Sequence, residues 1–493
     1  MNSWDKGLSR WNDNESPYTV KKGIFLSEIS LKSGCPMQMS TWIFELALII
    51  SVLQTLKCEN VHIRFLADLN LNFNFVSSLH TYRTKYRNLY VRMKNIKLIL
   101  LLIILLGTAC SPTGKRHPAW KEMPVVARME TVNGHPLTVA SLDLLNDTMN
   151  LPLSALVEEL QIVRLENREE ALVEPGYVCM SDNYMLVVNW KTPCKLFRKD
   201  GTFVCKVGNI GLGTGEYKWI YDVQIDEKNG RIYLLQRGTR EILSYNLEGK
   251  YEGSIPLHLP HPKMYVPKGV FQVDVEKNRV AVLSLPFSYL PNMAWVQDLE
   301  GNLCMSIPPR HLKLKPDFSN EIVFRKEAGQ WSFHVSPFFE LRKDTLYLWN
   351  LQDAEPVPYF TLDFGEKPIC LHNYRELPLY FYGRVATSKQ MTEDSYMSDQ
   401  ERYFIIDKET LKGGFCRIYN DWMCDEPIEE LTDFGGYYTE NIPPGALLER
   451  IEEFLKECPE GDTPRKQRLL ELKATIDRND NNYIIYGKHR TRK

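Results

Sequence analysis

The stretch YDVQIDEKNGRIYLL, residues 221–235, has the pattern of a β-hairpin. Apolar and polar side chains alternate over 221–226, as in a strand with one buried face, and Asp222 and Gln224 fall on the polar face. The turn 228–230 ends in glycine, which accepts the positive φ of a tight turn, and a second apolar run follows. A β-sheet therefore organises this part of the chain.

The same hairpin recurs along the sequence. FQVDVEKNRVAVLSL, residues 271–285, repeats its design 48 residues later, with Asp274 in the position of Asp226. FFELRKDTLYLWNL, residues 338–351, is interpreted as a third copy. A hairpin that returns at a nearly constant interval indicates a fold built from repeated units.

A second kind of hairpin accompanies the first. Asp-Gly or Glu-Gly turns occur in KLFRKDGTFVCKV (195–207), LSYNLEGKYEGSI (243–255) and WVQDLEGNLCMSI (295–307), and looser copies are PYFTLDFGEKPI (358–369) and YFIIDKETLKGGF (403–415). The turn glycines fall at 201, 249, 301, 365 and 413, at intervals of 48, 52, 64 and 48 residues. Two hairpins per interval make four strands, and four-stranded units with a period of about 50 residues are typical of β-propeller blades.

The end of the chain supplies a sixth blade. NNYIIYG, residues 481–487, is a strand without a hairpin of its own, and it follows a helical insert over about 445–478. The first helix of this insert carries one apolar stripe, formed by Leu447, Leu448, Ile451, Phe454 and Leu455. The early strand EELQIVRLE, 158–166, is the expected partner of the last strand, because pairing the two ends closes the ring and removes unpaired edges. We therefore expect an all-β, six-bladed β-propeller over 155–490, with four-stranded blades, a C-terminal helical insert and a closing C-terminal strand.

The glycine-rich run KVGNIGLGTGEYKWIYDV, residues 206–223, could be taken for a phosphate-binding loop. A P-loop requires Lys-Ser/Thr after its last glycine and then a helix, whereas Glu216 follows here, a strand pattern comes next, and the carboxylate would repel a pyrophosphate. The run instead indicates a sharp crossing between two blades. The residues of this structural connector are Gly211, Gly213, Gly215, Glu216 and Tyr217.

These segments resemble a known family. GLGTGEY (211–217) is similar to the Gly-x-Gly-x-Gly-Glu-Tyr blade connector of the six-bladed β-propeller lipoproteins of Gram-negative envelopes, relatives of the NHL-repeat propellers. The hairpin 221–235 resembles their best-kept blade, and IDRNDNNYIIYGK (476–488) resembles their closing turn and final strand, although Asn482 stands where a proline is usual. The resemblance implies the fold, and it implies no agreed biochemical activity.

A secretory signal lies inside the chain. From Met93 the sequence reads MKNIKLILLLIILLGTAC, with two lysines, nine consecutive apolar residues, three small residues and Cys110. Nine apolar residues span about 14 Å as a helix, too little for a bilayer core of about 30 Å. The cysteine after small residues resembles a bacterial lipobox, in which the thiol is acylated, although Gly107 departs from the usual pattern. We expect a lipoprotein signal peptide over 93–109 and lipid attachment at Cys110.

The position of this signal predicts the organisation of the N-terminal region. We infer that Met93 is the true start and that residues 1–92 are a mis-annotated upstream extension from a wrong start codon. Two alternatives remain: a plain secretory signal with a chance cysteine, and a membrane segment at 42–53, which carries Glu45. Residues 110–154 are expected to be a tether and lead-in to the propeller.

Charge and cysteine usage exclude several classes of protein. Residues 110–493 carry 47 basic and 55 acidic residues, a net charge of −8, so nucleic acid is not an expected partner. None of the eight cysteines after Cys110 forms a Cys-x-x-Cys pair, which excludes zinc-ribbon and thioredoxin motifs.

We expect a monomer anchored to the outer membrane. The segment 111–120 lacks the acidic run of some surface-exported lipoproteins, which favours the periplasmic face.

The remaining candidate sites give weak signals, so no cofactor is expected and metal binding stays open. DRNDNN (477–482) has the oxygen ligands of a calcium loop without its glycine, which favours an Asx-turn. His258 and His261 have metal-ligand spacing but no third ligand nearby, and DWMCDE (421–426) could line a pocket or simply pack.

Two function classes remain. The first is an envelope binding or scaffold module, whose propeller loops converge on a channel that takes a glycan, a peptide or a partner protein. The second is a propeller enzyme, a metal-dependent hydrolase or lyase with its site at the channel mouth. A rim of Trp and Tyr at the mouth would favour glycan or peptide binding, whereas three or more convergent His, Asp or Glu with shifted pKa values would favour the enzyme.

Overall fold

The computed structural model describes residues 119–492, except 147, 328, 339, 393–394, 424 and 458–462. The upstream extension 1–92, the signal peptide 93–109 and the lipid-attachment residue Cys110 lie outside the described residues. No helix within the described part has the length and apolar character needed to cross a membrane.

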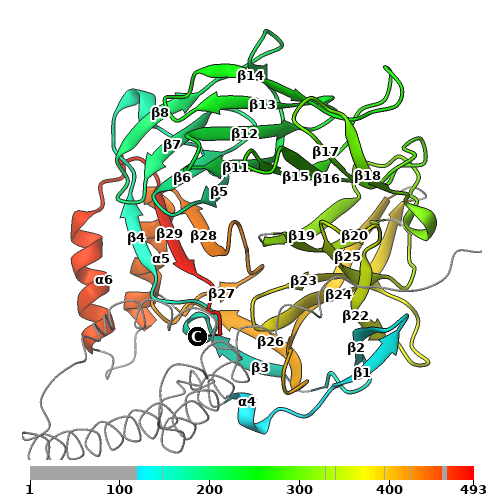
Figure 1. Cartoon of the computed structure of the whole chain (residues 1–493). Helices are drawn as coiled ribbons and strands as arrows, with labels where there is room; N and C mark the ends of the chain where they lie inside the picture. Colours follow the sequence, from blue (N-terminus) through cyan, green and yellow to red (C-terminus); the bar gives the residue numbers. More distant parts are fainter. Residues whose placement is uncertain are drawn as a thin grey trace, which may run out of the picture. The chain divides into compact units, whose positions relative to one another are not determined.

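Six of the β-sheets formed by the described residues are blades arranged around a central channel (Figure 1). The first three blades have four antiparallel strands each. Blade 1 holds β5 (Tyr177–Met180), β6 (Tyr184–Val188), β7 (Cys194–Arg198) and β8 (Phe203–Val207); blade 2 holds β11 (Ile220–Asp226), β12 (Arg231–Gln236), β13 (Glu241–Asn246) and β14 (Tyr251–Pro256); blade 3 holds β15 (Gly269–Asp274), β16 (Arg279–Ser284), β17 (Ala294–Gln297) and β18 (Leu303–Ile307).

The last three blades are less regular. Blade 4 holds β19 (Glu321–Glu327), β20 (Gln330–Ser336), β21 (Thr345–Asn350) and β22 (Val357–Asp363); blade 5 holds β23 (Leu371–Glu376), β24 (Tyr380–Thr392), β25 (Ser395–Asp407), β26 (Gly413–Tyr419) and β27 (Pro427–Ile428); blade 6 holds β28 (Tyr437–Ile442), β29 (Tyr483–Lys488) and β4 (Gln161–Arg164). The expected six-bladed propeller is confirmed, with one blade of three regular strands.

The N-terminal part of the chain completes the outer rims of blades 4 to 6. The strands β1 (Ala127–Val132) and β2 (His135–Ser141) form a hairpin, and β2 pairs in parallel with β22. The strand β3 (Thr148–Pro152) pairs in parallel with β26, and β4 pairs with β29. The stretch expected as a lead-in therefore belongs to the propeller from Ala127 onward, because its strands cover edges that would otherwise stay unpaired.

Short elements join the blades. They are the helix α4 (Ala119–Glu122), the 3₁₀ turns η1 (Leu153–Ala155), η2 (Glu169–Ala171) and η3 (Arg310–Leu312), and the paired strands β9 (Asn209–Ile210) and β10 (Glu216–Tyr217). The core lies between neighbouring blades, and each of the six blade pairs has its own cluster of buried apolar residues. Trp331 and Trp349, both fully buried, contact edge to face in the cluster between blades 3 and 4. Because both faces of every blade pack against neighbouring blades, the buried apolar surface stabilises the closed ring.

The predicted hairpin turns are right in the regular blades and partly wrong in the others. Gly201, Gly249 and Gly301 have φ of 88°, 78° and 88° in the turns between the last two strands of blades 1 to 3. Gly365 instead follows β22 on the way to blade 5, and Gly413 begins β26, where Leu411 takes the positive φ of the turn.

The third copy of the first hairpin was also placed wrongly. The stretch 338–351 holds only β21 and its approach, whereas the first hairpin of blade 4 is β19 and β20. The sequence of β19 includes IVFRKE, 322–327, in which three apolar residues precede three charged ones, and no Asp-Gly or Asn-Gly turn follows, so this hairpin has neither the alternation nor the turn of the other copies.

The helical insert is confirmed. The helices α5 (Pro444–Glu457) and α6 (Thr463–Thr475) lie between β28 and β29. Leu447 and Ile451 of the predicted stripe are fully buried and pack with Leu469 of α6 and with Ile485 of β29. The insert therefore rests on the closing strand through an apolar face.

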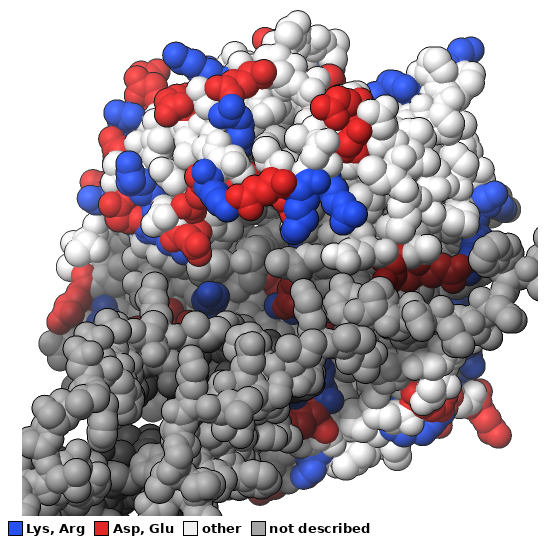
Figure 2. All heavy atoms as spheres, in the orientation of Figure 1, with Lys and Arg blue, Asp and Glu red and all other residues white. Residues whose placement is uncertain are grey.

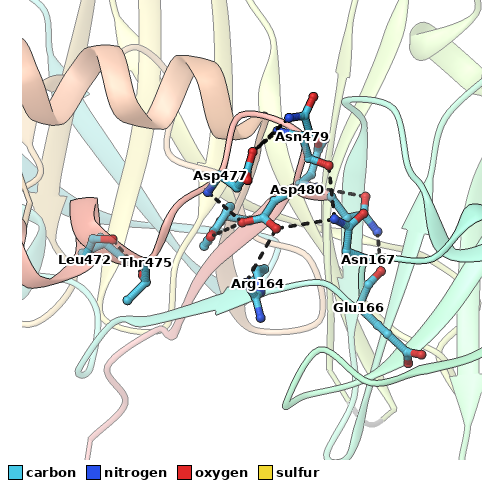
Figure 3. A network of polar contacts seen from close by, with 11 residues as sticks. Arg164, Glu166, Asn167, Leu472, Thr475, Asp477, Asn479 and Asp480 are labelled. Atoms are coloured by element: carbon cyan, nitrogen blue, oxygen red, sulfur yellow. Dashed lines mark hydrogen bonds and ion pairs between the residues drawn. The ribbon is translucent and has the colours of Figure 1, made fainter.

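Polar contacts around the turn before β29 fasten the two ends of the propeller (Figure 3). Asn481 is buried and donates to the carbonyl groups of Glu166 and Ala171 at 3.0 and 2.8 Å, while its Oδ1 accepts from the Val173 amide at 3.0 Å. Within the turn, the amide of Asn479 donates to Asp477 Oδ1, as in an Asx-turn. The stretch 477–482 therefore acts as a clasp in this structure.

Candidate functional site

The central channel contains a cavity of about 1350 Å³. Its walls are the innermost strands of five blades, β5, β11, β15, β19 and β23, together with the segment 430–436 that precedes β28. The lining runs from Tyr177 of β5 and Trp219, just before β11, to Lys326 of β19 and Arg375 of β23. Sites that hold small organic ligands have volumes of about 300 to 1000 Å³, so this cavity is large enough to hold one.

The innermost position of blade 6 has an irregular segment instead of a strand. Thr432 and Phe434 bond back to Thr439 and Tyr437 across a tight turn, in which Gly435 and Gly436 have φ of 68° and 84°. The Gly436 amide donates to Asp433 Oδ1 at 2.9 Å. The loop before β28 reaches toward the channel (Figure 1) and brings Glu430, Asp433 and Phe434 to its wall.

Polar side chains of β11 bind the open edge of the next inner strand, β15. Asp222 Oδ2 accepts the Phe271 amide at 2.9 Å, and Gln224 both accepts from the Val273 amide and donates to its carbonyl at 2.8 Å. Strand β15 is hydrogen-bonded on its other side to β16, so these side chains satisfy groups that would face the channel unpaired. The polar face expected for 221–226 therefore makes hydrogen bonds between blades 2 and 3.

Lys326 of β19, which is 104 residues from Asp222 in the sequence, also binds to this contact. Its Nζ donates to both carboxylate oxygens of Asp222 at 2.9 and 2.7 Å and to the Phe271 carbonyl at 3.1 Å. Asp222 is only 6% exposed, so its charge is held by this pairing. Three inner strands are joined here by one buried ion pair.

The other carboxylates of the channel wall are also paired. Arg325 lies 3.3 Å from Asp433 and 2.6 Å from Glu327, Arg375 contacts Glu430 at 3.1 Å, and Lys268 contacts Glu321. No histidine lines the channel within the described residues. Burial raises the pKa of the Cys179 thiol on β5 to about 12, so this channel cysteine stays protonated and unreactive at neutral pH. The wall therefore offers fixed charges and no activated nucleophile.

One end of the channel carries exposed aromatic side chains. Tyr177 pairs with Val188 and Ile220 with Gln236, so the segments that follow β6 and β12 lie at the end where β5 and β11 begin. Trp190 and Arg237 come from those segments, and Trp219 and Phe318 come just before β11 and β19. We call Trp190, Trp219, Arg237 and Phe318 the aromatic mouth.

The rings of the aromatic mouth are open to solvent. Trp190, Trp219 and Phe318 are 68%, 57% and 44% exposed, and both tryptophans line the cavity. Exposed aromatic rings next to a cavity mark a binding surface more often than single scattered apolar residues do. The aromatic mouth is therefore the part of the channel best suited to meet a ligand.

The predicted connector residues form a loop filled by its own carboxylate. The Gly213 amide donates to Glu216 Oε2 at 2.8 Å, and a Cβ on Gly211 would lie 2.0 Å from the same oxygen. The Tyr217 hydroxyl is buried, donates to the Val207 carbonyl at 2.6 Å and accepts the Cys194 amide at 2.7 Å. Gly215 has φ of 70° and lies against Tyr251. The loop has no space for a phosphate.

The other sequence candidates lie away from the channel. The His258 amide donates to Gln297, and His261 Nδ1 accepts the Lys263 amide. No group of three metal-ligating side chains occurs in the described part of the chain.

The stretch 421–426 joins the helical insert to blade 5. Asp421 accepts from Ser154, Asp425 pairs with Arg465, and Glu426 pairs with Arg450; Cys424 lies outside the described residues. These contacts are structural, and no described residue of this stretch lines the central cavity.

Sequence reasoning did not find the channel residues. Lys326 and Asp222 are 104 residues apart, and no local pattern connects them. Trp219 and Trp190 stand in connecting segments, where an exposed tryptophan is the only available signal. Lys/Arg and Asp/Glu side chains are intermixed on the visible face (Figure 2). The distribution of charge on that face therefore does not indicate a binding site.

The fold and the channel define a six-bladed β-propeller with one aromatic mouth. The chain belongs to the family described as "Domain of unknown function (DUF4934)", whose model matches residues 138–488. No curated protein matches the sequence.

Several solved structures are similar to the propeller. A Bacteroides fragilis protein named "Putative exported protein" is 14% identical, covers 72% of this chain and 100% of its own, and has a TM-score of 0.48. A member of the DUF4221 family from Bacteroides vulgatus is 11% identical, with coverages of 68% and 97% and a TM-score of 0.38. A Bacteroides caccae protein of unknown function is 15% identical, with coverages of 52% and 87% and a TM-score of 0.30.

Proposed function

We propose that this protein is a binding module of the cell envelope whose ligand enters the propeller channel at the aromatic mouth. The observation that carries the proposal is the pair of solvent-exposed tryptophans, Trp190 and Trp219, at the rim of a cavity of about 1350 Å³. A ligand that covers these rings removes apolar surface from water, and the rigid blades hold the rings in place for it.

The channel wall favours binding over catalysis. Each carboxylate named above is engaged by a lysine or arginine, as Asp222 is by Lys326 and Glu430 is by Arg375. General acid–base chemistry or metal binding needs carboxylates or histidines free to meet a substrate or an ion. The alternative of a metal-dependent hydrolase or lyase therefore receives no support from this wall.

The proposed location rests on the sequence. The lipobox-like segment before Cys110 supports export and lipid attachment, with the propeller on the periplasmic side of the outer membrane. A Cys110→Ser variant tests this part: it should leave the membrane fraction and lose incorporation of labelled palmitate. Cleavage of the native protein by a protease added to intact cells would place it on the cell surface instead.

Arrays of oligosaccharides and peptides, probed with the purified full-length protein, test the proposed function. A Trp219→Ala variant should lose about tenfold or more in affinity for whatever the wild type binds, because an exposed ring at a cavity rim contributes most when it is covered. Leu470→Ala is a suitable control, since Leu470 is an exposed apolar residue of α6, away from the channel. Equal binding by both variants and the wild type would contradict a site at the mouth.

A further inference from the structure

We propose that the aromatic mouth binds an acidic saccharide, with Arg237 as the residue that binds its carboxylate or sulfate group. This inference rests on the proposed function and names the class of ligand for the same site. It starts from the position of Arg237, which directly follows β12 and whose amide donates to the Trp219 carbonyl at 2.8 Å.

The guanidinium of Arg237 lies over two aromatic rings. Its central carbon is 5.8 Å from the centre of the Trp219 ring and 5.2 Å from the centre of the Phe318 ring. Contact with aromatic rings restricts the orientation of a guanidinium plane and leaves the N–H groups at its edge free to bind a ligand. That edge is the part of arginine that binds two oxygens of one oxyanion with two parallel hydrogen bonds.

Arg237 differs from the other cations of the channel. Those cations each contact a carboxylate: Lys268 contacts Glu321, Arg325 contacts Glu327 and Asp433, Lys326 contacts Asp222, Arg375 contacts Glu430, and Arg384 contacts Glu401. Arg237 also lines the cavity and has no acidic partner among the residues that the structure describes. One uncompensated positive charge at the mouth therefore attracts an anionic group of the ligand.

The surroundings of Arg237 favour a saccharide over a peptide. The flat, exposed faces of Trp190 and Trp219 suit the C–H faces of sugar rings, which are apolar, while the sugar hydroxyls stay in water. An extended peptide gains most from pairing with an open strand edge. The nearby edge of β15 is already occupied by Asp222 and Gln224, so it offers no such pairing.

Nucleic acid fits the aromatic mouth less well. Binding to a phosphate backbone needs a row of free cations. Among the cations that line the cavity, Lys268 and Lys326 are engaged by carboxylates and so are the others, which leaves Arg237 as the one without an acidic partner in the described structure.

The test uses purified full-length protein and isothermal titration calorimetry. The probes are uronate and sulfated oligosaccharides, their methyl-esterified or desulfated counterparts, and tetraglutamate. Arg237→Gln should weaken binding of the acidic saccharides about tenfold to hundredfold, because it removes a charge-assisted contact, and should change binding of the neutral counterparts less than about twofold. The matched control is Arg198→Gln, since Arg198 also lies over an aromatic ring, Tyr184 at 5.8 Å, but outside the cavity lining.

The outcomes separate this inference from the proposed function. Equal affinity for acidic and neutral saccharides, or equal effects of Arg237→Gln and Arg198→Gln, overturns the role of Arg237, while a loss caused by Trp219→Ala still supports binding at the mouth. Binding of tetraglutamate without any saccharide overturns the ligand class. Failure of every probe, with no effect of Trp219→Ala on the arrays, overturns both. Uronate and sulfated probes distinguish the two oxyanions.

Discussion

At the scale of single residues, the buried histidines tie the stability of the propeller to pH. His334 of β20 is fully buried, and its ring lies 6.0 Å from that of His372 and 4.8 Å from that of Tyr374. Neither ring nitrogen of His334 has a hydrogen-bond partner in the described structure. Burial, with smaller effects of His372 and Arg342, holds the pKa of His334 well below its usual value.

This burial predicts acid sensitivity. Burial also lowers the pKa of His372 and His489. The unfolded chain binds a proton at each histidine as the pH falls through about 6.5, whereas the folded chain binds it only at lower pH, so the contribution of these histidines to the free energy of unfolding falls below that pH and is constant above it. Each histidine contributes up to about 1.4 kcal/mol per pH unit in this range.

Replacing His334 should flatten this dependence. Between pH 7.5 and 5.5 the wild type should lose about 1 kcal/mol more than His334→Phe, a variant that keeps an aromatic ring beside Tyr374. Urea denaturation followed by circular dichroism at the two pH values measures this difference. His135→Gln, at an exposed position of β2, should behave as the wild type does. Parallel losses in wild type and His334→Phe would show that His334 does not contribute.

At the scale of elements, the contact between inner strands depends on one buried ion pair. Lys326→Met should lower the free energy of unfolding by about 3 to 5 kcal/mol, because it leaves the carboxylate of Asp222 buried without its partner. Adding Asp222→Asn should recover at least half of the loss, since the amide oxygen can still accept from Phe271.

The same measurement has a matched control at the surface. Lys228 pairs with Glu276 between neighbouring turns, and both side chains are exposed. Lys228→Met should therefore leave the free energy of unfolding almost unchanged. A comparable loss in the two lysine variants would mean that the buried pair adds nothing beyond a surface contact.

Local sequence patterns predict some of the hairpin turns correctly and others wrongly. The Asp-Gly and Glu-Gly turns at Gly201, Gly249 and Gly301 were predicted correctly, because each lies between two strands that are adjacent in sequence. Gly365 and Gly413 lie in looser copies of the pattern and have different roles, since β22 pairs with β2 and β26 with β3 from a distant part of the chain. Pairing with these N-terminal strands decides which turn closes which hairpin, and no local pattern contains that information.

At the scale of the whole molecule, closure of the ring depends on the clasp around Asn481. Asn481→Ala removes four hydrogen bonds, three of them to 166–173, and leaves buried carbonyl and amide groups of that stretch without these partners. The melting temperature should fall by several degrees, corresponding to about 2 to 4 kcal/mol. Asn479→Ala, at an exposed position of the same turn, should have little effect. An unchanged melting temperature in both variants would show that the clasp does not hold the ends together.

The sequence by itself determined the repeat of hairpins, the six blades, the helical insert and the closing strand. These follow from alternation and turn chemistry within about 15 consecutive residues, a range over which backbone geometry is set locally. Only the tertiary structure decided how Asp222, Lys326, Trp219, Arg237 and Phe318 share one channel, and that 127–152 completes the rims of blades 4 and 5. The reason is physical: closing the ring brings residues about 100 positions apart into contact, and their partners are chosen by burial and charge rather than by any spacing along the chain.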